Sequence, residues 1–137
     1  MRISILAFGR AGACEEQALA ERYLARLSPP ARLVELARGP VPPAPPRSLT
    51  IALDERGEAW SSAELARRMT GWADAGVRDL RFLIGPADGL AARDRDAADH
   101  LLAFGVQTWP HLLVRAMLAE QLFRAQSLRT GHPYHRA

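Results

Sequence analysis

Short apolar segments alternate with longer segments of helical periodicity along nearly the whole chain, and this alternation restricts the possible folds more than any other feature. Strands are expected at Arg2–Gly9, Arg32–Ala37, Leu49–Leu53, Leu80–Ile84 and Leu101–Thr108, and helices at Glu15–Leu27, Ser61–Ala75, Ala91–Ala98 and His111–Leu128. Such an order favours an α/β domain with a largely parallel sheet flanked by helices.

Local signals set several boundaries of these segments. Pro29 and Pro30 stop the first helix, and Ser61 with Glu64 forms a capping box that opens the second. Residues 39–46 (GPVPPAPP) hold five prolines in eight residues, which predicts a stiff surface connector. A length of 137 residues suits one domain, residues 1–137, with this connector inside it.

Composition excludes some classes of protein. No apolar stretch reaches the ~18 residues of a membrane span, and Met1–Ile5 predicts a strand instead of a signal peptide. Cys14 is the only cysteine, so an intrachain disulfide is impossible and a cytoplasmic location is expected. The net charge of +3 does not demand a polyanionic partner. All 18 basic residues are arginine, which suits contacts with phosphates but is equally explained by a GC-rich genome.

Three loops are expected where strands end, at Asp54–Gly57, Gly85–Gly89 and Trp109–Pro110. Ligands of parallel sheets usually bind at the carboxyl ends of strands, and glycines let a backbone approach a ligand closely. The glycines of Gly85–Gly89 also suit an ordinary turn. Gly9–Gly12 lacks the full pattern of a dinucleotide site and is interpreted as a turn.

The last helix is apolar over most of its circumference, which predicts burial inside the chain or against a second copy. His111 and Arg115 share one face, while Glu120 and Arg124 have the spacing of an intrahelical ion pair. The tail after this helix gathers two histidines, a tyrosine and an arginine. Three interpretations of the tail are open: a substrate contact, a disordered end, or a metal site from two histidines without an evident third ligand.

Ordered motifs along nearly the whole chain resemble the ribosomal RNA large subunit methyltransferase H family. The matching segments, with the family pattern that each resembles, are Leu53–Gly57 (LD-x-x-G), Ser61–Glu64 (SSE), Leu83–Leu90 (IGG-x-x-G), Thr108–Arg115 (MT-x-PH-x-x-x-R), Leu118–Ala125 (L-x-EQ-x-YRA) and His132–Arg136 (PYH followed by K or R). The resemblance implies a knotted SPOUT-type α/β fold with a C-terminal trefoil knot. It also implies a homodimer that uses S-adenosylmethionine to methylate N3 of a pseudouridine in 23S ribosomal RNA within the ribosome, without a metal and without a membrane.

The resemblance also assigns roles to residues. The expected cofactor-binding residues are Leu53, Gly85, Phe104, Gly105, Val106, Gln107, Thr108 and Trp109. The candidate catalytic residues are His132, His135, Arg124 and Arg136, and the candidate substrate-binding residues are Tyr134 and Arg115. Imidazoles could accept the N3 proton and arginines could stabilise the resulting anion, and the choice among them stays open.

Two departures from the family pattern favour alternative hypotheses. Pro86 stands where the family usually has a second glycine, and residues 39–46 replace a family helix. A catalytically degenerate relative that binds RNA or ribosomes is one alternative. A SPOUT methyltransferase with another RNA target is the other.

Overall fold

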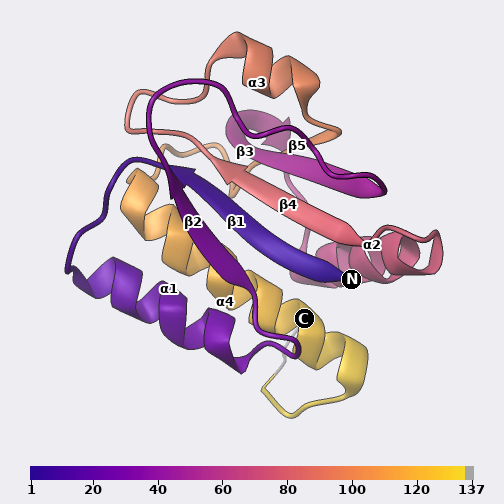
Figure 1. Ribbon diagram of the computed structural model, residues 1–137. Helices are drawn as coiled ribbons and strands as arrows, with labels where there is room; N and C mark the ends of the chain where they lie inside the picture. The colour runs from indigo at the N-terminus through magenta and orange to yellow at the C-terminus, as the bar shows by residue number, and fades with distance from the viewer. Residues whose placement is uncertain (135–137) are drawn as a thin grey trace.

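Five parallel strands form one sheet in the computed structural model, which describes residues 1–134 (Figure 1). The strands are β1 (Arg2–Phe8), β2 (Arg32–Leu36), β3 (Ser48–Glu58), β4 (Asp79–Ile84) and β5 (His100–Leu102). They lie in the order β2-β1-β4-β3-β5, and every neighbouring pair is parallel. The predicted α/β architecture with a parallel sheet is therefore confirmed.

The helices cover the two faces of this sheet unequally. They are α1 (Glu15–Arg26), α2 (Ser62–Asp74), α3 (Ala92–Ala97) and α4 (His111–Thr130). Figure 1 shows α1 and α4 side by side along one face, whose larger apolar core also contains side chains of α2. Only a smaller core lies on the opposite face, on the side of α3.

Strand β1 shows why the second halves of the central strands are apolar without a break. Ile5 and Ala7 belong to the larger core, while Leu6 and Phe8 belong to the smaller one. Successive side chains of a strand point to opposite faces, and both faces are covered here. A continuous apolar run is therefore required, as is usual in parallel sheets.

The fifth strand is much shorter than expected, so the prediction of a strand over Leu101–Thr108 is wrong after Leu102. β5 ends at Leu102, and Gly105 adopts a φ of +96°, which a strand does not allow. The indole Nε1 of Trp109 donates a hydrogen bond to the carbonyl of Phe104 at 3.0 Å. This bond closes residues 104–109 into a loop at the end of the sheet.

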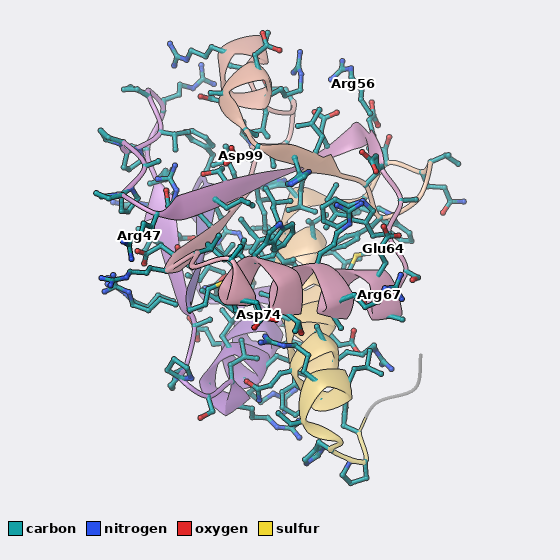
Figure 2. All side chains as sticks on the ribbon, turned by 90° about the vertical axis from the view of Figure 1, so that its right-hand side faces the viewer. Arg47, Arg56, Glu64, Arg67, Asp74 and Asp99 are labelled. Atoms are coloured by element: carbon teal, nitrogen blue, oxygen red, sulfur yellow. The ribbon has the colours of Figure 1, made fainter. Side chains whose placement is uncertain are left out.

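The third strand is longer than expected because it continues to Glu58 through a bulge. Both Leu53 and Glu58 are in register with Leu102, so residues 54–57 leave the ladder. The bulge carries Arg56 outward from the sheet (Figure 2). A Cβ on Gly57 would lie 2.5 Å from the backbone of Leu101, so only glycine fits where the strand returns.

The proline-rich connector, residues 39–46, adopts neither helix nor strand. Arg81 of β4 ties it to the sheet, donating to the carbonyl of Pro42 at 2.9 Å and to the hydroxyl of Thr50 at 3.1 Å. Val41 adds an apolar contact with the smaller core. The connector therefore covers part of the sheet face. Burial of the guanidinium lowers the pKa of Arg81.

Within residues 1–134, no helix has the length and apolar character needed to cross a membrane. The C-terminal trefoil knot and the extent of the single domain, residues 1–137, stay predictions.

Candidate active site

Three loops meet at the carboxyl ends of β3, β4 and β5 and enclose a cavity of about 310 Å³. This volume is at the lower end of the range of small-molecule sites, about 300–1,000 Å³. The lining residues are 53–56, 84–90, 95, 102–105, 107–109, 111 and 114. The position agrees with the general rule that parallel sheets bind ligands at the carboxyl edge.

Most of the expected cofactor-binding residues lie together in this cavity. Those in the lining are Leu53, Gly85, Phe104, Gly105, Gln107, Thr108 and Trp109. Val106 is the exception, because its side chain is 96% exposed and is absent from the lining. The cofactor-binding role of Val106 therefore stays a prediction from the resemblance.

The loop after β4 depends on Gly85. A Cβ at this position would lie 2.8 Å from the backbone nitrogen of Leu90, closer than real Cβ contacts allow. The next residue, Pro86, accepts a hydrogen bond from the N–H of Gly89 at 2.9 Å, which makes the turn tight. Pro86 forms part of the wall and leaves the cavity open.

The mouth of the cavity carries carboxylates that the sequence analysis did not single out. The hydroxyl of Thr108 donates to Glu55 at 3.0 Å and so joins the bulge of β3 to the loop at residues 104–109. Asp54 accepts from the backbone N–H of Arg56 at 2.8 Å and lies 4.0 Å from Arg95. These contacts hold the bulge in shape. In the sequence, the polar LD-x-x-G turn could have indicated Asp54 and Glu55, whereas no sequence feature indicates Arg95.

Arg115 is fully buried one turn after His111, which lines the cavity. Its guanidinium donates to Glu35 at 2.6 Å, to Gln17 at 3.1 Å and to the carbonyl of Gly9 at 3.1 Å. The expectation that Arg115 contacts the substrate is not supported, because an enclosed guanidinium offers no surface to RNA. Its hydrogen bond holds the pKa of Glu35 below its ordinary value.

Glu120 and Arg124 form the intrahelical ion pair that their spacing predicted, with Nε of Arg124 at 2.9 Å from the carboxylate. The phenol of Tyr134 donates to the same carboxylate at 2.9 Å and lies 3.2 Å from the hydroxyl of Tyr23. Burial raises the pKa of Tyr134, and the two hydrogen bonds raise it further. The hydrogen bond with Glu120 raises the pKa of Arg124. Tyr134 thus stays protonated and Arg124 stays charged.

The tail folds back beside the middle of α4. The N–H of Tyr134 donates to Nδ1 of His132 at 3.1 Å, and the rings of both residues pack against Phe123. The remaining candidates, His135 and Arg136, lie outside the described residues. Val114 is the last residue of α4 in the lining of the cavity, and at 1.5 Å per residue Glu120 and Phe123 lie about 9 and 14 Å further along the helix. The structure therefore does not bring His132 and Tyr134 to the cavity of their own chain.

No group of three His, Cys, Asp or Glu residues in the described part of the chain could hold a metal ion. The two-histidine metal hypothesis also depends on His135, which lies outside that part.

Comparison with known proteins identifies the family. The family model described as "Predicted SPOUT methyltransferase" matches residues 37–135, which include the whole lining of the cavity. The chain belongs to the SPOUT methyltransferase family. It is accordingly a methyltransferase, and the residues that match the family model include all those that line the cavity.

Full-length relatives support this assignment. The protein named "Ribosomal RNA large subunit methyltransferase H" of Zymomonas mobilis is 54% identical over 140 residues, which cover 99% of each chain. The protein of the same name from Rhodopseudomonas palustris is 38% identical over 160 residues, covering all of both chains. A "probable methylase family protein" from Haemophilus influenzae superposes with a TM-score of 0.60 at 11% identity, covering 96% of this chain and 67% of that one. This last likeness supports the fold alone.

If S-adenosylmethionine binds in this cavity, as the sequence resemblance implies, replacing Gly85 with alanine should weaken its binding at least tenfold while the protein stays folded. The added Cβ forces the backbone at Leu90 to move, which opens the loop that forms one wall of the cavity. Calorimetric titration measures the change, with Gly71→Ala as the control because a Cβ there meets no atom within 4 Å. Equal affinity in the two variants would contradict the role of this loop.

Proposed function

We propose that this chain methylates N3 of a pseudouridine in 23S ribosomal RNA, in the stem-loop at the subunit interface of the ribosome, using S-adenosylmethionine. The observation that carries the proposal is the convergence of the loops at Leu53, Gly85 and Phe104 in one cavity. The names of the full-length relatives support ribosomal RNA as the substrate. Action on ribosomes also favours a cytoplasmic location.

The residues around the cavity suit S-adenosylmethionine. Apolar surfaces of Leu53 and Trp109 suit an adenine, and the loop backbones of residues 85–90 and 103–105 offer hydrogen-bonding groups to it. The lining holds the carboxylates of Asp54, Glu55 and Asp88 against the guanidinium groups of Arg56 and Arg95, and this small excess of negative charge favours a cationic sulfonium. When bound, S-adenosylmethionine supplies an electrophilic methyl group. The chain itself has to hold the base in line and exclude water.

The N3 proton of the base must be removed, because an imide nitrogen is a weak acid. Tyr134 does not serve as the base, since its raised pKa keeps it protonated. Stacking on an extruded base would require its ring to leave the contact with Phe123. Arg124 keeps its positive charge and suits stabilisation of the anion. His132, together with His135 and Arg136 outside the described residues, completes the set of candidates.

We infer a homodimer in which each tail serves the cavity of the partner. The residues of α4 that hold the tail, Glu120 and Phe123, lie about 9–14 Å along the helix from Val114, the last residue of α4 in the cavity of the same chain. An apolar hollow of about 540 Å³ between α1, α2 and α4 is open for a second copy. Leu19, Tyr23 and Met117 line this hollow, and it shares residues 102–105 with the cavity. A second chain bound in this hollow would place its own residues beside the cavity of the first chain.

Methyl transfer from labelled S-adenosylmethionine to ribosomes tests the proposed function. Ribosomes from a strain without its own enzyme of this type should accept one methyl group, and mass mapping of 23S RNA should place it on N3 of a pseudouridine. A methyl group on another nucleotide would show that the enzyme has a different RNA target from the one proposed. Absence of cofactor binding in calorimetry would support the non-catalytic alternative instead.

Single alanine substitutions of His132, Tyr134 and His135 test the tail. We expect at least one of them to lower the turnover number about 100-fold or more, as is typical for loss of a general base. Cofactor affinity should change much less than the turnover number, because the loops of one chain already form the cavity. Unchanged methylation in all three variants would exclude a catalytic tail.

A further inference from the structure

A second hollow, which we call the arginine groove, lies at the same edge of the sheet as the cavity. It has a volume of about 930 Å³ and lies over the carboxyl ends of β1 and β2, with the start of α3 on its other side. Residues 86 and 88–90 line both hollows, so the loop after β4 is the wall between them. A chain-like ligand in the groove would therefore pass directly beside the cavity.

Three arginines from three different elements line this groove. Arg10 follows β1, Arg38 follows β2, and Arg93 belongs to α3. Arg10 and Arg38 are exposed, and neither forms a side-chain hydrogen bond or a close ion pair within residues 1–134. Arg93 lies 3.9 Å from Asp94, at the limit of an ion pair. These guanidinium groups are available to a ligand.

Carboxylates in the groove only partly offset this positive charge. Glu35 lies 2.6 Å from the buried guanidinium of Arg115, so its charge is compensated from inside the protein. Asp88 and Asp94 remain in the lining against three arginines. The groove thus keeps an excess of positive charge although the net charge of the whole chain is only +3.

We propose that the arginine groove binds the phosphate backbone of the RNA strand whose base enters the cavity. Guanidinium groups bind phosphate oxygens through paired N–H donors, and phosphate contacts position an RNA without reading its sequence. A strand held by Arg10 and Arg38 can pass across the wall at residues 86–90 and present the next base to the cavity. This proposal rests on the proposed function, because it assumes an RNA substrate.

The double variant R10Q/R38Q tests the proposal in methyl transfer to unmethylated ribosomes. We expect the KM for ribosomes to rise about tenfold or more, while kcat at saturating ribosomes and the affinity for S-adenosylmethionine stay unchanged. Each lost phosphate contact should lower the slope of log affinity against log salt by about 0.7–0.9, so the double variant should lose about 1.5.

The control is R47Q/R67Q, which removes the same charge elsewhere. Arg47 precedes β3 at the amino edge of the sheet and Arg67 lies exposed on α2 (Figure 2). This control should keep the KM and salt slope of the unchanged protein. Equal KM values for R10Q/R38Q and the control would overturn the groove proposal. A wild-type protein that does not methylate ribosomes at all would instead overturn the proposed function.

A photo-crosslinking residue in place of Ala37 identifies what occupies the groove. Ala37 is exposed and lines the groove between Glu35 and Arg38. Crosslinks on the ribosome should map to 23S RNA within a few nucleotides of the methylated base. Crosslinks to a ribosomal protein, with none to RNA, would mean that the groove binds protein and would overturn the proposal.

Discussion

At a concentration of S-adenosylmethionine that saturates the wild type but not Gly85→Ala, mixing two nearly inactive variants should restore methyl transfer to about a quarter of the wild-type rate if the dimer is symmetric and its tails act in trans. One variant is Gly85→Ala, which has a damaged cavity and an intact tail. The other is a chain truncated after Gly131, which has an intact cavity and no tail. Half of the randomly exchanged dimers would contain one chain of each kind, and each would have one complete site.

The physical reason is the distance between the tail and the cavity within a chain. Tyr134 is held by Glu120 and Tyr23 beside the middle of α4, while the cavity begins at His111. The intervening helix is rigid, so the described tail residues cannot stay beside Glu120 and also reach the cavity of their own chain. In a mixed dimer, the complete site combines the cavity of the truncated chain with the tail of the Gly85→Ala chain.

Rates are measured after the two homodimers have exchanged subunits, which a tag on one variant verifies. Each variant alone provides the baseline, and circular dichroism shows that both are folded. Activity that stays at the baseline after verified exchange would show that each tail serves its own chain. The homodimer proposal itself would fail if the wild-type protein sedimented as a monomer at assay concentration.

Arg115→Ala should lower the free energy of unfolding by about 2–5 kcal/mol, because it leaves a cavity at a fully buried position and removes the donor of three hydrogen bonds. The guanidinium is fully buried and joins α4 to α1, β2 and the end of β1 through Gln17, Glu35 and Gly9. Arg129→Ala, at an exposed position on the same helix, is the control and should change stability by less than about 0.5 kcal/mol. Urea denaturation measures both, and a loss below about 1 kcal/mol for Arg115→Ala would contradict this role.

The Glu35–Arg115 pair also predicts how stability depends on pH. The pKa of Glu35 is lowered in the folded state from an ordinary value of 4.5, chiefly by the hydrogen bond from Arg115. Its stabilising contribution is therefore complete above pH 4.5 and is lost as the pH falls through the lowered folded value. Glu35→Gln lacks this titration, so its stability should fall less steeply below pH 4.5. Parallel pH curves for the two proteins would contradict the assignment.

Periodicity and motif order determined most of the fold and of the candidate site. The second halves of β1 and β4, Ile5–Phe8 and Phe82–Ile84, are apolar without a break because both faces of the sheet are covered, and that pattern is visible in the sequence. The loops at Leu53 and Gly85 followed from the rule that ligands bind at the carboxyl ends of parallel strands. Local sequence failed at Leu101–Thr108, where Gly105 turns the chain out of the strand.

Only the tertiary structure decided which of the polar candidates face solvent. Arg115 and Arg124 belong to one helix at a spacing of nine residues, yet the first is enclosed beside Glu35 while the second lies partly exposed beside Glu120. Helical spacing relates residues of one helix to each other, but it cannot say which face α1 and the sheet will cover. That choice depends on contacts between segments far apart in the chain. The same holds for the hydrogen bond that joins Thr108 to Glu55 and for the position of Tyr134 beside Glu120, away from the cavity of its own chain.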